Sequence, residues 1–122
     1  MDNRIVVCVT RQKNCRRLIQ YAADMRDKRG DCAVTVVHVV KHGDNFLGND
    51  QEGQALEFLF QTAKEYGADM FVLKADDVTA SLKQYAEENN ARCMVLGRSP
   101  EVENPYIKSL GKQLQGVEMI EI

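Results

Sequence analysis

The apolar and polar positions of the chain follow two alternating periods. Residues 4–10 ("RIVVCVT") and 33–40 ("AVTVVHVV") are continuous apolar, β-branched runs, which are typical of strands buried on both faces. Three shorter apolar runs follow them. The pattern predicts strands near residues 4–10, 33–40, 69–74, 93–97 and 117–122.

Four segments with helical spacing separate these strands. Their apolar positions are Leu18, Ile19, Ala22 and Met25; Ala55, Leu56, Leu59, Phe60, Ala63 and Tyr66; Val78, Leu82, Tyr85 and Ala86; and Ile107, Leu110 and Leu114. Gly30 and Gly67 fit the ends of the first two helices, and Asp76 or Asp77 fits the N-cap of the third. We expect the second helix to turn Phe60 and Tyr66 toward the core.

Strands that alternate with helices through short connections require a parallel sheet with right-handed crossovers. The chain is therefore predicted to form one three-layer, doubly wound α/β domain over residues 1–122. Ligands of such sheets bind beyond the carboxyl ends of the strands. A site is accordingly expected in the loops at residues 10–14, 40–50, 75–77 and 97–104.

Composition narrows the classes of function. The formal net charge of -2 provides no excess of positive charge that would attract nucleic acid. No signal peptide opens the sequence and no apolar run approaches the length of a membrane span, so we expect a cytoplasmic protein without a membrane or nucleic-acid partner.

The candidate reactive side chains form no catalytic or metal-binding pattern. The cysteines Cys8, Cys15, Cys32 and Cys93 lack the spacing of a metal knuckle or redox pair, and we expect them reduced and buried. Cys15 alone stands near a helix start beside two arginines, where a redox-sensing thiolate is the alternative to a partly covered first-turn residue.

Histidine and serine add no catalytic group. Neither His38 nor His42 has a metal-binding partner at motif distance, and Ser99 has no base nearby. Helix capping explains Asp76 and Asp77 more simply than a magnesium pair does. The sequence therefore predicts no catalytic residue and no metal site.

Several stretches of the sequence resemble those of a known protein family. "RIVVCVT…NCRRLIQYAADM", "TVVHVV" and "AKEYGADMFVLKADDVTASLKQYAEENNARCMVLGRS" resemble the universal stress protein family, closest to the stress-protein module of potassium-sensing histidine kinases. The resemblance implies an adenine nucleotide alpha hydrolase-like sheet of five parallel strands in the order 3-2-1-4-5. It also implies that the domain is often dimeric. The ATP-binding members of the family hold the nucleotide between strands 1 and 4.

The phosphate-binding motif of those members is incomplete in this chain. They look like G-x-x-G-x9-G-[ST] after the fourth strand and carry an aspartate after the first. Here Gly97 matches the first glycine, Pro100 stands at the second, and no Gly-Ser or Gly-Thr follows at the expected distance. Thr10 or Arg11 occupies the aspartate position. Proline has no N–H to donate to a phosphate, so the site is predicted to be degenerate.

The contacts still available to a nucleotide are few. Main-chain groups of Val39 and Val40 could meet adenine; ribose or phosphate could be met by Thr10, Arg11, Gly97, Arg98 and Ser99. The sequence firmly implies no cofactor, and ATP or AMP, weakly bound, is the candidate. We predict a non-catalytic regulatory binding domain; the alternative is a protein-interaction module without a nucleotide, and a nucleotide hydrolase is less favoured.

Two features concern partners. The terminal strand, which begins at Val117 and finishes at Ile122, is predicted to pair antiparallel with a second copy in a homodimer, although Glu118 and Glu121 oppose this. The Phe46-Leu47 pair in the longest loop fits a pocket lid and internal packing equally well.

Overall fold

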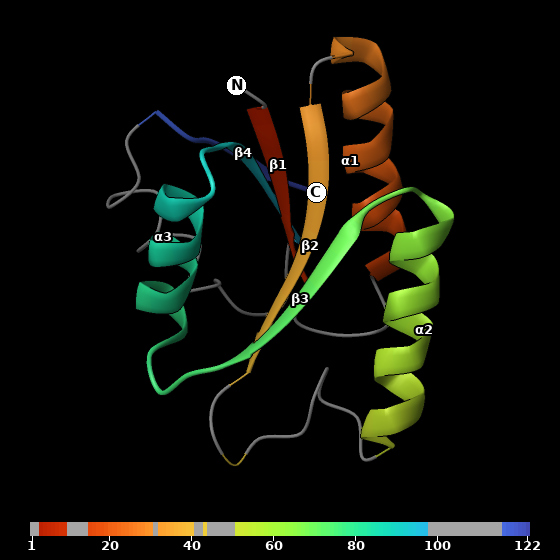
Figure 1. The fold of residues 1–122 in the computed structure, drawn as a ribbon, viewed down its shortest axis with the longest axis vertical. Helices are drawn as coiled ribbons and strands as arrows, with labels where there is room; N and C mark the ends of the chain where they lie inside the picture. The colour runs from red at the N-terminus through yellow and green to blue at the C-terminus, as the bar shows by residue number, and fades with distance from the viewer. Residues whose placement is uncertain (1–2, 10–14, 31, 41–42, 44–50, 98–115) are drawn as a thin grey trace.

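The secondary structure alternates strand and helix from the start of the chain. A computed structural model describes residues 3–9, 15–30, 32–40, 43, 51–97 and 116–122. Its elements, drawn in Figure 1, are β1 (Asn3–Cys8), α1 (Cys15–Arg29), β2 (Cys32–Val40), α2 (Glu52–Glu65), β3 (Asp69–Lys74), α3 (Val78–Glu88), β4 (Ala91–Leu96) and β5 (Glu118–Glu121). None of the described helices is long and apolar enough to cross a membrane.

The strands form one five-stranded parallel sheet in the order β3-β2-β1-β4-β5. The predicted doubly wound fold and strand order are confirmed. The strand ends differ from the prediction, since β1 stops at Cys8 and β4 begins at Ala91. The last predicted helix, which carries Ile107, Leu110 and Leu114, lies outside the described residues.

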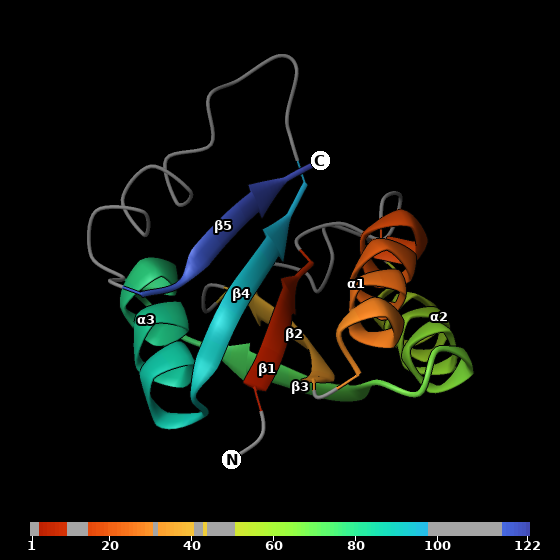
Figure 2. The same ribbon diagram turned by 90° about the horizontal axis from the view of Figure 1, so that it is seen from above.

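Two apolar layers hold the sheet. On one face, α1 and α2 cover a cluster that contains Ile5, Val7 and Val36; on the other, α3 covers Val6 and Met94. Figure 2 shows α1 and α2 on one side of the strands and α3 on the other. Every one of these five side chains is at most 1% exposed, so β1 is buried on both faces as its continuous apolar run predicts.

Helices α1 and α2 end as expected from their glycines. Gly30 (φ +80°) and Gly67 (φ +70°) adopt left-handed conformations that other residues enter at a cost. The N–H of Gly30 donates to the carbonyl of Arg26 at 2.8 Å. The Arg26 guanidinium in turn donates to the carbonyl of Tyr66 at 2.6 Å, which ties the end of α1 to the end of α2.

The expectation for Phe60 is wrong. Its side chain is 50% exposed, whereas Leu59 and Ala63 of the same helix are buried and Tyr66 packs partly against the core. At about 100° per residue, Phe60 lies roughly 100° from Leu59 around the helix, beyond the edge of the apolar stripe. The apolar face of α2 is therefore narrower than the sequence pattern predicts.

The cysteines are free thiols, as expected, and all except Cys32 are buried as expected. Cys8, Cys15 and Cys93 are buried and Cys32 is half-buried; all four are free. Burial raises the pKa of Cys8 to about 12 and that of Cys93 to about 11, so both remain protonated thiols at neutral pH.

Asp77 is the N-cap of α3. The sequence predicted either Asp76 or Asp77 for this position. The Asp77 carboxylate accepts a hydrogen bond of 3.0 Å from the N–H of Ala80.

We predict that Asp77→Ala lowers the free energy of unfolding by about 1 kcal/mol, because an N–H of the first turn loses its acceptor. Asp77→Asn keeps an acceptor and should cost less. Urea unfolding followed by circular dichroism measures both; equal losses would contradict a capping role.

Candidate functional site

The candidate site lies where the strand order reverses, at the carboxyl ends of β1 and β4. Cys8 pairs with Val37 of β2 and with Leu96 of β4, so the residues that follow these three emerge at the same edge. In an open parallel sheet this is the position at which ligands bind. The described part of the edge consists of Val9, the end of β2, Gly97 and the first turn of α1.

Three of the predicted site residues fall at this edge. Val39 and Val40 are 8% and 5% exposed, so only their main chain could meet a ligand, as predicted. The carbonyl of Val40 already accepts the N–H of Ala75 at 3.0 Å. The other candidates, Thr10, Arg11, Arg98 and Ser99, lie outside the described residues, as do Pro100 and the Phe46-Leu47 pair.

Gly97 follows β4 directly and lies against α1. A Cβ added there would contact the Leu18 side chain at 3.6 Å, an ordinary van der Waals distance. The backbone of Gly97 is not left-handed either. The fold itself therefore does not require glycine at this position, which fits a role in letting another group approach the end of β4.

His38, for which the sequence shows no metal-binding partner, is a buried side chain of this edge. It is 2% exposed, and its Nδ1 lies 2.7 Å from the carbonyl oxygen of Val9. A carbonyl can only accept, so Nδ1 carries the hydrogen. Burial lowers the pKa of His38, and the hydrogen bond to Val9 opposes this less strongly. The ring is therefore neutral at pH 7 and holds the end of β1 against β2.

The cations at the start of α1 are already engaged with protein groups. A guanidinium nitrogen of Arg16 lies 2.9 Å from a carboxylate oxygen of Glu65, and its central carbon lies 5.8 Å from the Phe58 ring centroid. The hydrogen bond with Glu65 raises the pKa of Arg16. Arg17 donates to the main-chain carbonyl of Ile122 at 3.2 Å. Both arginines thus join α1 to other elements.

Cys15 begins α1 but does not present a reactive thiolate. Its side chain is fully buried, not partly covered as the sequence suggested. Burial raises the pKa of the Cys15 thiol, and the N–H of Arg16 and its charge oppose this less strongly. A protonated, inaccessible thiol is a poor redox sensor.

A second polar cluster lies at the opposite, amino end of the strands. Arg4 donates a hydrogen bond to the fully buried hydroxyl of Thr35, and its guanidinium lies 3.9 Å from a carboxylate oxygen of Asp69. These contacts satisfy Thr35 and join β1, β2 and β3. Among the residues that the structure describes, no three His, Cys, Asp or Glu side chains are grouped so that they could hold a metal ion.

The strand order defines a doubly wound α/β domain, a class in which small ligands bind at the switch point. The model of the universal stress protein family matches residues 1–102, and the chain belongs to this family. A search of the curated proteins found no match.

Solved structures of low sequence identity share the fold. A universal stress protein from Archaeoglobus fulgidus superposes with a TM-score of 0.74 at 21% identity, over 100% of this chain and 94% of that one. A complex of the protein from Archaeoglobus fulgidus with dAMP gives 0.71 at 20% identity, over 98% and 97% of the two chains. A family protein from Arabidopsis thaliana with AMP bound gives 0.60 at 14%, over 98% and 91%.

The lowered pKa of His38 generates a prediction about pH dependence. The folded state binds fewer protons at His38 than the unfolded chain does, so acidification through the ordinary histidine pKa of about 6.5 should destabilise the fold. His38→Gln keeps a donor that could reach Val9 but does not titrate. Between about pH 7 and pH 5, the wild type should lose more unfolding free energy in urea than this variant. Parallel losses would show that His38 does not contribute.

Proposed function

We propose that this chain is a regulatory binding domain without catalysis of its own, whose adenine-nucleotide site is degenerate and binds ATP or AMP weakly or not at all. Family membership and the switch point between β1 and β4 support a place for a nucleotide. The observation that carries the proposal is the sequence "GRSPEVEN" after β4, which offers a phosphate few of the groups that it needs.

The residues of that segment disfavour the binding of an anion. Pro100 has no N–H, and it replaces the glycine that allows the backbone to approach phosphate oxygens. Glu101 and Glu103 add negative charge close by in sequence, which repels a triphosphate. Arg98 and Ser99 remain as candidate anion contacts, together with Thr10 and Arg11 on the same edge.

The described residues of the edge support the same conclusion. Helix α1 starts at the switch point, where its N-terminal dipole would favour an anion. Its two first-turn cations, Arg16 and Arg17, instead hold Glu65 and the carbonyl of Ile122. Binding phosphate through them would break contacts that join α1 to α2 and to the residue after β5. An adenine could still meet main-chain groups of Val39, which lies two residues beyond Val37, the partner of Cys8 at the end of β1.

Membership of the family and the resemblance of the sequence to the stress-protein module of sensor kinases support a regulatory role. Such a domain would act in the cytoplasm by presenting a surface to another protein. The exposed aromatic rings of Phe60 and Phe71, at 50% and 47%, favour this interaction role as the second candidate, with no nucleotide involved. Nucleotide hydrolysis is least supported, since no pair of nucleophile and base is recognised in the sequence.

A titration with a fluorescent ATP analogue, with and without magnesium, tests the proposal. We expect a dissociation constant of about 100 µM or weaker, because each good charge-assisted phosphate contact is worth roughly 1.5–3 kcal/mol and several are missing. Micromolar affinity would contradict a degenerate site.

Two controls sharpen the result. Pro100→Gly restores the glycine of the motif and should strengthen binding if the rest of the site is intact. Gly97→Ala should leave stability nearly unchanged, since the added methyl meets Leu18 at an ordinary distance, but should weaken any residual binding. Release of phosphate from ATP by the wild type would support the hydrolase instead.

A further inference from the structure

The outer edge of β3 lies outside the candidate site, on the opposite side of the sheet from β5. Among the described strands, β3 pairs only with β2, in a register that begins with Asp69 opposite Thr35. An edge strand presents main-chain N–H and C=O groups that have no partner in their own sheet. A homodimer through β5, which the sequence predicts, would leave this edge accessible.

The direction of these main-chain groups follows from one hydrogen bond. The N–H of Ala75, the residue after β3, donates to the carbonyl of Val40 in β2 at 3.0 Å. Main-chain directions alternate along a strand as its side chains do, so the N–H of Phe71, four residues earlier, also faces β2. The N–H groups of Met70 and Val72 therefore face away from the sheet. They recur about 7 Å apart, which is the spacing that an extended chain matches.

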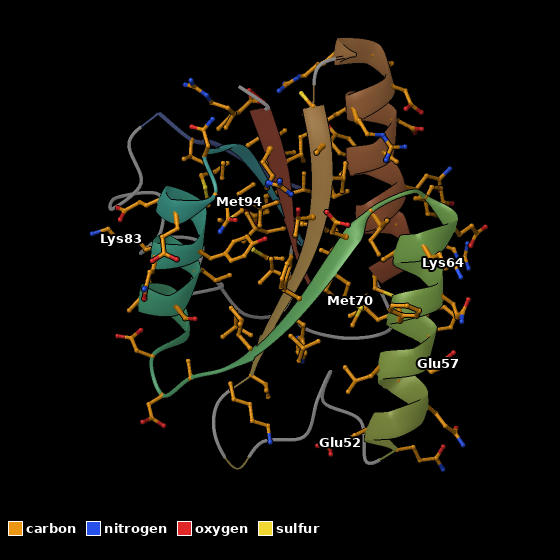
Figure 3. The ribbon with its side chains drawn as sticks, in the orientation of Figure 1. Glu52, Glu57, Lys64, Met70, Lys83 and Met94 are labelled. Carbon is orange, nitrogen blue, oxygen red and sulfur yellow. The ribbon has the colours of Figure 1, made fainter. Side chains whose placement is uncertain are left out.

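A groove of about 570 Å³ adjoins the first half of this edge. Its lining comes from α2, from the turn after α2 and from β3, and consists of Phe60, Ala63, Lys64, Gly67, Ala68, Asp69, Met70 and Phe71. The rings of Phe60 and Phe71 are about half exposed. In Figure 3, Met70 lies between β3 and α2. The groove has room for an apolar side chain of a strand that pairs with this edge.

The charges beside the groove favour an acidic partner. Lys64 is exposed and forms no ion pair with the described residues. Asp69 already lies 3.9 Å from the Arg4 guanidinium. Lys74, at the other end of β3, is exposed and has the same parity as Met70, whose side chain packs on the α2 side of the sheet. A strand with a carboxylate two residues before and two residues after its apolar residue would meet a positive charge at each end.

A second copy of the chain fits this edge poorly. Two antiparallel β3 strands centred on Val72 would place Lys74 of each copy opposite Met70 of the other, close to Lys64, and these like charges repel. The edge of β5 carries carboxylates, but Glu118 already lies 3.8 Å from the Arg29 guanidinium. A contact of β3 with β5 would also join two different surfaces, which adds copies without end unless the rotation closes a ring. The edge therefore suits an acidic segment of another protein.

We propose that an extended segment of another protein adds to the sheet as a strand beside β3. Its apolar side chain enters the groove, and its carboxylates approach Lys64 and Lys74. Main-chain hydrogen bonds with Met70 and Val72 provide affinity, whereas the groove and the two lysines select the sequence. This inference rests on the proposed role of the domain in presenting a surface to another protein, and it specifies the partner.

A blocked peptide of the sequence Thr-Glu-Thr-Leu-Thr-Glu-Thr, added to the whole chain, tests the proposal. The sequence reads the same in both directions, so the peptide can pair parallel or antiparallel with β3. We expect saturable binding with a dissociation constant of about 1 mM or tighter. In hydrogen exchange followed by nuclear magnetic resonance, the amides of Met70 and Val72 should exchange freely in the protein alone and about tenfold more slowly with excess peptide. The same peptide with N-methylated main chain should not bind.

Three variants each remove one part of the proposed contact. Val72→Pro deletes an N–H that β2 does not use, which an edge strand tolerates, and should weaken binding about tenfold. Lys64→Glu should weaken it about fivefold and should favour a peptide with lysine in place of glutamate. Phe60→Ser should weaken binding by opening the groove. As matched controls, Phe58→Ser truncates an exposed ring of α2 outside the groove and Lys83→Glu reverses a charge on α3, and both should leave binding unchanged.

Three results would overturn the proposal. Protection of the Met70 and Val72 amides in the protein alone would mean that the chain itself, or a second copy detected by sedimentation, covers the edge. The peptide might also leave both amides unprotected at millimolar concentration, or bind the Val72→Pro and Lys64→Glu variants as well as the wild type. Circular dichroism confirms that each variant is folded. The ATP titration does not involve this surface, so tight nucleotide binding would refute the degenerate site alone, and an unbound peptide this docking edge alone.

Discussion

The structure depends on the burial of β1. This strand has a parallel neighbour on each edge and an apolar layer on each face, and Val6 and Val7 are both 0% exposed. Its main-chain groups can be satisfied only by β2 and β4, and its side chains only by helices on both sides. The three layers and the position of the switch point at its carboxyl end follow from this constraint.

The same constraint explains what happens at the end of β1. A strand buried to its last residue needs partners for its final polar groups. The N–H of Val9 donates to the carbonyl of Val37 at 3.0 Å, and the ring of His38 approaches the carbonyl of Val9. The edge at which related folds bind ligands is here held together by protein contacts. At the start of α1, Arg16 and Arg17 add further contacts, with Glu65 and with the carbonyl of Ile122.

Much of the fold could be predicted from the sequence because the signals are local. The apolar runs of β1 and β2, the glycines after α1 and α2 and the cap at Asp77 each act within a few residues. Phe60 was misplaced because one apolar residue at the margin of a helical stripe does not reveal the width of the surface that covers it. The contact of Arg16 with Glu65 spans two helices and has no sequence signature. Of the predicted site, only Val39, Val40 and Gly97 fall within the described residues.

We propose that this chain keeps the scaffold of a nucleotide-binding stress protein and binds the nucleotide weakly or not at all. Native mass spectrometry of protein purified without added ligand tests this proposal, because a tightly held nucleotide survives purification and adds its mass to the 13.8 kDa polypeptide. We expect polypeptide masses, alone or doubled, without AMP or ATP. A stoichiometric adenine nucleotide carried through purification would contradict the claim.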